Sequence, residues 1–597
     1  MKKHKLTVMS LLLVLSFFLA ACNGGDDGES TSGDSQDPVT EENEEEVTEE
    51  NEEEVTEENE EEVVEEGPTE GGVATYAVES EFDGLFNFAF YDGSVDGDIL
   101  SFFDENLIGV DDNLQYVPGI ADWTTDDNIN YTFTFQQGVK WHNGDELTVH
   151  DWVFSLETIA HPDYDGVRFV NVSDIVGAQE FRAGEADNIS GLNVIDDYTI
   201  EITFDKARVN NLENLWTYPM NRTEFAGIEV KDMSGSPQVR QNPVGLGPFK
   251  VKKIVPGEYV EMERFDDYYQ GRPYLDGVVV KVIDSSLTKG LLENGEVDMM
   301  GVHPSNLGEV EALNNIDLLE IPGLSYYYIG FKMGEWDGDK NVMNIEKYQD
   351  KKLRQAMLYA IDRQAWVDAF FSGLAQPVNR PVPSVHWIAA ENDILTNQFE
   401  YSPEKAMELL DEAGYVDVDG DGLRDNPAGE KFTVKFGHYA TSNPTYEARA
   451  QAILQYWQDI GLDAQFATGG LIEVNLYYDM LENDDRELEV FYGGWYTGTD
   501  PDPSPLWGSD AKFNYTRWVD AENDRLLDDA LDMEIVGTDT EKRMEIYKEW
   551  QQFFNEEVPV LPIMELYDLW AVNNRLQGTH INSVGAQNDV HLWYISE

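Results

Sequence analysis

The chain has 597 residues with 117 acidic and 39 basic side chains, so its formal net charge is −78. This charge excludes nucleic acid and anionic membrane surfaces as partners, because both repel carboxylates. With 41% hydrophobic residues and 14 tryptophans, the chain can bury a substantial core. Its only cysteine, Cys22, leaves no disulfide to stabilise that core. Outside the first 70 residues, 94 acidic and 36 basic residues remain, so the folded part is itself acidic.

The first 22 residues have the anatomy of a secretory signal. Three lysines within the first five residues precede an apolar run at 11–20, which is too short to span a membrane. A lone cysteine is usually a small buried hydrophobe, but not at the end of a signal peptide. Residues 19–22 resemble a bacterial lipobox, which implies cleavage after residue 21 and lipid attachment to the sulfur of Cys22. We therefore expect a lipoprotein of the Gram-positive type, on the extracellular face of the cell membrane.

A low-complexity segment follows the signal. Residues 39–62 repeat one eight-residue unit three times, and each unit contains a single valine among glutamates. Such a segment cannot bury a core, and self-repulsion extends it. The sequence predicts a disordered acidic tether over 22–70. Weak, unspecific cation binding by the glutamates is the alternative function.

From residue 71 onward the sequence predicts a mixed α/β protein. Alternating apolar residues at 131–135 and 198–204 indicate strands with one buried face. Helical periodicity predicts helices at 350–361 and 402–414. The Asp and Ser that begin these helices are N-cap residues, and the Gly that ends the second is typical of a C-cap.

Four stretches carry the most recognisable pattern. They are residues 135–155, residues 243–250 with 266–276, residues 353–363 and residues 493–503. In the first, Asn143-Gly144 predicts a tight turn, and Thr148 with Asp151 predicts a helix cap. The Gly-x-Gly in the second resembles a phosphate loop only superficially, because a proline follows it and no Gly-x-Gly-x-x-Gly occurs.

In order and spacing, these stretches resemble the extracellular solute-binding proteins of the peptide/nickel-type ABC importer family, closest to Gram-positive oligopeptide-binding lipoproteins. The resemblance implies an α/β, two-lobed, hinged periplasmic-binding-protein-like fold of the large peptide-binding type, with an extra subdomain in the first lobe. The implied boundaries are 1–21 for the signal peptide, 22–70 for the tether, 71–107, 241–323 and 558–597 for lobe I, 108–240 for the extra subdomain, and 324–557 for lobe II.

The resemblance also implies a function. Oligopeptides would bind in an interlobe cleft through backbone hydrogen bonds and would pass to the permease subunits of an ABC transporter with their ATPases. We expect a monomer, no enzyme activity, no required cofactor, and membrane contact only through the lipid on Cys22. The alternatives are another solute (a dipeptide, nickel chelate, haem or oligosaccharide), a peptide-pheromone sensor, or a secreted hydrolase that uses paired carboxylates.

In familiar peptide-binding members, an aspartate three residues after the tryptophan of the fourth stretch holds the ligand ammonium. That position is Gly498 here, and Asp500 and Asp502 are the nearest carboxylates. Either these aspartates contact the ligand or they cap turns beside the prolines. The aromatic candidates are either ligand contacts or core residues. The full set of predicted ligand-binding residues is Trp495, Tyr496, Asp500, Asp502, Trp507, Tyr327 and Phe88.

A loop in the second half of the chain has calcium-like spacing. Asp417, Asp419, Asp421 and Asp425 place oxygens at positions 1, 3, 5 and 9 of a calcium loop. Position 12 is Ala428, so the bidentate glutamate of an EF-hand is missing. The sequence therefore leaves open a structural calcium site or an Asp/Gly-rich surface turn.

Overall fold

The computed structural model describes residues 67–440 and 445–596. The predicted signal peptide, the predicted lipidation site Cys22 and the first part of the predicted tether, 22–66, lie outside the described residues. Within the described ranges, no helix combines the length and the apolar character needed to cross a membrane.

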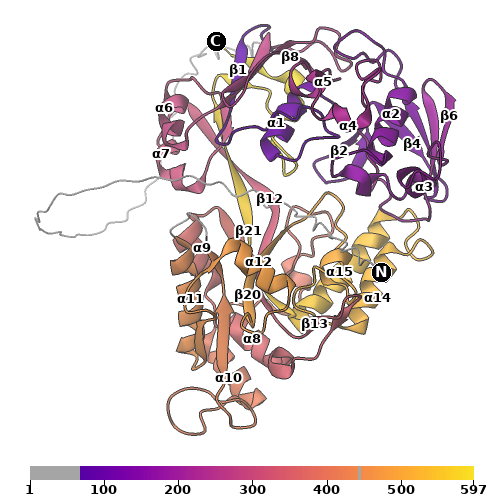
Figure 1. Ribbon diagram of the computed structural model, residues 1–597. Helices are drawn as coiled ribbons and strands as arrows, with labels where there is room; N and C mark the ends of the chain where they lie inside the picture. Colours follow the sequence, from indigo (N-terminus) through magenta and orange to yellow (C-terminus); the bar gives the residue numbers. More distant parts are fainter. Residues whose placement is uncertain (1–66, 441–444, 597) are drawn as a thin grey trace, which may run out of the picture.

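Two lobes share one continuous sheet (Figure 1). Lobe I lies at the top of the figure and includes the yellow C-terminal segment, and lobe II lies at the bottom. The order from lobe II to lobe I is β18 (Asp463–Phe466), β16 (Thr433–Gly437), β20 (Val490–Tyr496), β12 (Ile316–Phe331), β21 (Val560–Asn573), β11 (Met299–Gly301), β1 (Val73–Val78), β10 (Gly277–Val282), β9 (Tyr259–Arg264) and β8 (Phe249–Val255), with β15 (Ala375–Pro377) paired to β21. The prediction of a two-lobed α/β fold is confirmed.

Lobe I also carries a separate antiparallel sheet, which we call the subdomain sheet. Its order is β4 (Ala121–Thr124), β5 (Asn130–Phe135), β7 (Thr199–Thr203) and β6 (Leu192–Asp196). Four two-stranded pairs complete the strands: β2 (Ile108–Val110) with β3 (Tyr116–Pro118), β13 (Glu335–Trp336) with β14 (Asn341–Val342), β17 (Tyr439–Ala440) with β19 (Ile472–Glu473), and β22 (Leu576–Gln577) with β23 (Tyr594–Ile595).

The helices pack against these sheets in both lobes. In lobe I they are α1 (Ser94–Phe103), α2 (Val149–Ala160), α3 (Ala178–Arg182), α4 (Val230–Met233), α5 (Pro237–Arg240), α6 (Thr288–Glu293) and α7 (Leu307–Val310). In lobe II they are α8 (Lys351–Tyr359), α9 (Arg363–Phe371), α10 (Pro403–Ala413), α11 (Thr445–Asp459), α12 (Val474–Glu482), α13 (Ser504–Trp507), α14 (Ala521–Leu531) and α15 (Thr540–Glu557).

The predicted helix starts are confirmed at residue level. The side chain of Asp350 accepts a hydrogen bond from the backbone N–H of Lys352 and so caps α8. Ser402 caps α10, and Gly414 ends it in the left-handed conformation that glycine favours. Thr148 and Asp151 form the predicted capping box of α2.

The two long strands β12 and β21 run through both lobes and bend between them. Their register is lost between Pro322 and Tyr326, where residues 323–325 lie opposite the single residue Leu566. Extra residues of this kind bend a strand and increase its local twist. We call residues 323–325 the hinge bulge, because the shared sheet changes direction there.

Each lobe has its own hydrophobic core. The larger core cluster fills lobe II, and a second fills lobe I together with the subdomain sheet. Trp593, close to the C-terminus, belongs to the same cluster as Tyr76 on the first strand. Thr69 and Glu70, at the end of the predicted tether, also contact lobe I: the Thr69 hydroxyl donates to the Ile595 carbonyl, and Glu70 pairs with Arg272.

Two stretches that identify the sequence meet in lobe I. The backbone N–H of His142 donates to the Gly245 carbonyl at 3.0 Å, and its Nε2 lies 2.9 Å from the Gly247 carbonyl. A Cβ atom on Gly245 would lie 2.0 Å from the carbonyl oxygen of Phe103. Close backbone approach to the end of α1 therefore requires glycine here, and the Gly-x-Gly is a packing feature.

Candidate functional site

One carboxylate of lobe I forms a hydrogen bond with lobe II. The Thr499 hydroxyl of lobe II donates to Glu213 Oε2 of lobe I at 2.8 Å. The Tyr116 hydroxyl, also in lobe I, donates to the same oxygen and lies 3.4 Å from Thr499 Oγ1. Burial and the Glu213 carboxylate raise the pKa of Tyr116, so Tyr116 remains a donor. We call these three residues the interlobe latch.

A second contact lies near the latch. The side-chain amide of Asn128, in the loop between β4 and β5, donates to the Met533 sulfur at 3.2 Å. Both contacts join the subdomain region of lobe I, whose sheet lies at the right of Figure 1, to lobe II. The latch lies close to the hinge bulge, because the backbone N–H of Thr497, two residues before Thr499, donates to the carbonyl of Leu324 at 2.8 Å.

Strand β20 presents its aromatic residues on two different faces. Paired residues of antiparallel strands point to the same face, and neighbours along a strand alternate. Trp495 is paired with Tyr326, whereas Tyr496 is paired with Ser325, so their side chains point in opposite directions. Tyr327 lies on the face of Tyr496. The structure thus separates the predicted ligand-binding aromatics into two groups.

Tyr496 is exposed close to the point where the two lobes meet, and we call this position the recess. Its side chain is 56% exposed, yet burial is the main cause that raises its pKa, followed by Asp568 and Glu213. Protein atoms therefore surround an accessible ring. Since Glu213 belongs to lobe I and Asp568 to β21, Tyr496 faces both the latch and the hinge.

Asp568 is a functional candidate that the sequence did not reveal. It lies on β21 beside the hinge bulge, where it pairs with Ile321. Its side chain is exposed and has no hydrogen bond or ion pair with any described residue. Burial nevertheless raises its pKa, since it stands in the same recess as Tyr496. One aspartate among many in an acidic chain gives no sequence signal for this position.

The predicted anchor Asp500 has a partner within lobe II. Its carboxylate binds the guanidinium of Arg543 at 2.8 and 3.0 Å, and both side chains are more than nine-tenths buried. Asp502 accepts the N–H and the hydroxyl of Ser504 at 2.9 and 2.6 Å, as expected of a residue that caps a turn. In this conformation both oxygens of Asp500 and one oxygen of Asp502 are engaged within lobe II.

Side-chain contacts within lobe II hold the loop between β20 and α13 in place. Nε2 of His386 donates to the Gly498 carbonyl at 2.9 Å. Burial lowers the pKa of His386 to about 4, so its imidazole is neutral. Together with the Asp500–Arg543 pair, this hydrogen bond fixes the loop that carries Thr499 of the latch.

Three predicted aromatics lie elsewhere. Trp507 is 1% exposed in the core of lobe II, where its Nε1 donates to the Tyr326 hydroxyl at 3.1 Å. Phe88 is 6% exposed in lobe I and stacks on Tyr218 with ring centroids 3.8 Å apart. Trp495 is half-buried and stacks on Tyr515. The structure does not bring these residues together with Tyr496.

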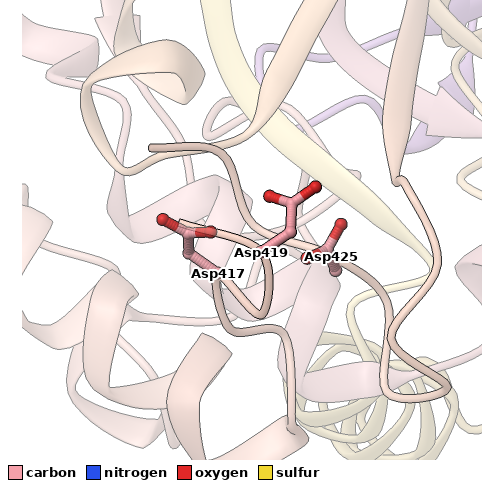
Figure 2. Close-up of side chains that lie close together, drawn as sticks. All are labelled: Asp417, Asp419 and Asp425. Atoms are coloured by element: carbon pink, nitrogen blue, oxygen red, sulfur yellow. The ribbon is translucent and has the colours of Figure 1, made fainter. Parts of the chain in front are cut away.

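A lysine of the protein itself occupies the calcium-like loop, although it lies outside the motif in the sequence. Oxygens of Asp417, Asp419 and Asp425 lie within 4.8 Å of one another (Figure 2). The ammonium of Lys431 lies 2.7 Å from Asp419, 2.5 Å from Asp421 and 3.6 Å from Asp425. The donor set suits calcium, but Lys431 already neutralises part of its charge.

We predict that the stability of this loop does not depend on calcium. Chelation by EDTA should leave the melting temperature of the wild-type chain unchanged, because Lys431 supplies the positive charge. Lys431→Met should make the melting temperature rise on addition of Ca²⁺, as measured by scanning calorimetry. Lys352→Met, which removes a surface pair with Glu412 at 3.1 Å, is the control and should show no such rise. A wild-type chain that melts at lower temperature in EDTA would contradict this prediction.

We predict that Thr499→Val shifts the lobes toward an open arrangement. The substitution removes a hydroxyl donor to a carboxylate, an interaction of about 1.5–3 kcal/mol, which corresponds to roughly a tenfold or larger change in the equilibrium. Fluorescence resonance energy transfer between dyes on the two lobes measures the change. Thr134→Val, on an exposed position of β5, should leave the distance distribution unchanged. Identical distance distributions for Thr499→Val and wild type would show that the latch does not hold the lobes together.

Comparison with known proteins places the chain in a family. The model of "Bacterial extracellular solute-binding proteins, family 5 Middle" matches residues 115–517. The chain is 26% identical over 607 residues to the oligopeptide-binding protein AppA of Bacillus subtilis, with 100% of this chain and 99% of that protein covered. It is 25% identical over 491 residues to the oligopeptide-binding protein OppA of Lactococcus lactis subsp. cremoris, with 79% and 81% covered.

The fold agrees with these matches. The structure of AppA from Bacillus subtilis in complex with a nonapeptide superposes with a TM-score of 0.62 at 25% identity, covering 89% of this chain and 100% of that one. The predicted resemblance to the peptide/nickel-type family, and to its Gram-positive oligopeptide-binding members, is confirmed. The chain belongs to the family 5 bacterial extracellular solute-binding proteins.

Proposed function

We propose that this protein is a lipid-anchored extracellular receptor that binds oligopeptides between its lobes and delivers them to the permease of an ABC transporter. The observation that carries the proposal is the position of Tyr496, which is exposed, pairs with Ser325 of the hinge bulge and lies three residues before Thr499, whose hydroxyl contacts Glu213 of lobe I. A ligand held there would contact both lobes and favour their closure. Similarity to oligopeptide-binding proteins over the whole chain supports the peptide as ligand.

The remaining expectations are part of the same proposal. Lipid on Cys22 would keep a monomeric receptor near its permease, and the acidic tether would give it reach. The tether and the lipid are its only link to the membrane in this proposal. The family is one of solute-binding proteins, which fits a receptor rather than a secreted hydrolase. No cofactor is needed for binding of this kind.

We further propose that Asp568 holds the ammonium of the ligand. The family position three residues after Trp495 is Gly498 and offers no carboxylate. Asp500 is engaged by Arg543. Asp568 is the carboxylate of the recess without a partner among the described residues, and an ammonium would pair with it by a charge-assisted hydrogen bond.

Native mass spectrometry of the chain purified from its own host tests the ligand class. We expect a series of bound masses that fragment as peptides. A single bound haem, sugar, dipeptide or nickel chelate would contradict oligopeptide binding and identify the alternative. Growth of a deletion strain on peptides as nitrogen source distinguishes uptake from pheromone sensing.

We predict that Asp568→Asn weakens the binding of a free peptide about tenfold, which corresponds to one charge-assisted hydrogen bond of roughly 1.4 kcal/mol. The same variant should bind the N-acetylated peptide as wild type does, since that ligand has no ammonium. Isothermal titration calorimetry measures both affinities. Asp317→Asn, on the exposed lobe I end of β12, is the control. If the wild type binds the free and the N-acetylated peptide with the same affinity, Asp568 does not hold the ligand ammonium.

A further inference from the structure

Lobe I contains a cavity that the proposed peptide site does not use. Its volume is about 410 Å³. It is lined by the end of α1, the hairpin of β2 and β3, the segment around Tyr268 and the C-terminal residues 580–591. None of its lining residues is Tyr496, Asp568 or a member of the latch.

The cavity is strongly negative. Its lining includes the carboxylates of Glu105, Asp111, Asp112 and Asp589 but neither lysine nor arginine. His580 lies between two of them, with Nε2 3.0 Å from Asp112 and Nδ1 3.2 Å from Asp589. A concave site with one sign of charge concentrates ions of the opposite sign. The ligand it favours is therefore a cation.

A buried imidazole in the wall has no hydrogen bond. His591 is 9% exposed, and its ring packs against Tyr268 with centroids 5.4 Å apart. None of the described residues hydrogen-bonds its ring nitrogens, which are not fully buried because His591 lines the cavity. Burial lowers the pKa of His591, so the ring is neutral and one nitrogen can accept a hydrogen bond. A ligand N–H that enters the cavity can therefore donate to this nitrogen.

Glu105 adds a second acceptor near the histidine. Its Oε2 accepts a hydrogen bond from the Tyr268 hydroxyl at 2.8 Å. Burial raises the pKa of Glu105 to about 7, because no cation offsets its desolvation. A positively charged ligand would stabilise the ionised carboxylate.

The spacing of the acceptors argues against a metal ion. Metal ligands must converge on one point within about 2–3 Å of the ion. Among described residues, the one cluster of such groups is Asp417, Asp419 and Asp425, which lies in lobe II. Acceptors distributed around a cavity suit an extended molecule with several N–H donors instead.

We propose that the lobe I cavity binds a small organic polycation of the diamine class. Its ammonium groups would donate to Glu105, to the neutral imidazole of His591 and to the carboxylates beside His580. The site is separate from the proposed peptide site and does not depend on what binds there.

Isothermal titration calorimetry of the full chain with 1,4-diaminobutane tests the proposal, in 0.3 M NaCl to suppress counterion binding to the surface. We expect one site per chain, and a tenfold or larger loss of affinity in Glu105→Gln and in His591→Phe. The matched control Asp339→Asn removes an exposed carboxylate from the turn between β13 and β14 in lobe II and should bind as wild type. Neutral 1,4-butanediol should not bind.

The outcomes that overturn the proposal are distinct from failure of the peptide hypothesis. No binding of the diamine to wild type would overturn it, as would equal losses in Glu105→Gln and Asp339→Asn, which indicate unspecific attraction to an acidic surface. Peptide affinity is measured on the same variants and should not change in Glu105→Gln. A diamine that competes with peptide on the wild-type chain would show that the two sites are one.

Discussion

The pairing of β12 with β21 is the constraint on which the rest of the structure depends. These strands join the lobes through a shared ladder of backbone hydrogen bonds, and the hinge bulge interrupts that ladder between Pro322 and Tyr326. The backbone N–H of Thr497 donates to the carbonyl of Leu324 within the bulge at 2.8 Å. The loop that carries the latch residue Thr499 is therefore attached directly to the hinge. A change in the bend of the sheet must move the latch and the recess together.

The acidic chain uses several of its few cations inside the protein. Arg354 on α8 donates to the carbonyls of Val558 and Tyr348 at 2.7 Å. It thereby fixes the segment just before β21 to α8 of lobe II. Lys332 and Arg517 share the carboxylate of Asp484 in the same lobe. Buried charges need partners of this kind, because an unpaired one loses its hydration without compensation.

These internal pairings also explain why the sequence left open whether Asp500 contacts a ligand. Asp500 stands beside prolines and close to Trp495, which made it a natural ligand candidate. Its partner Arg543 lies 43 residues further along the chain, and nothing in the spacing of the two indicates a contact. In the same way Lys431 lies outside the calcium-like motif and enters it only because the loop folds back. Local patterns identify groups that can bind a ligand. They do not show whether another side chain of the same protein already occupies those groups.

The sequence by itself determined the family, the α/β class and the local elements. Caps at Asp350 and Ser402, and the turn at Asn143-Gly144, depend on neighbouring residues and could be read directly. Only the tertiary structure decided which side chains share a site. Glu213 and Thr499 are 286 residues apart, and Tyr496 points away from Trp495 although the two are adjacent. The first pair depends on how the lobes meet, and the second on the register of β20 with β12. Neither follows from local spacing, because both are set by contacts between distant parts of the chain.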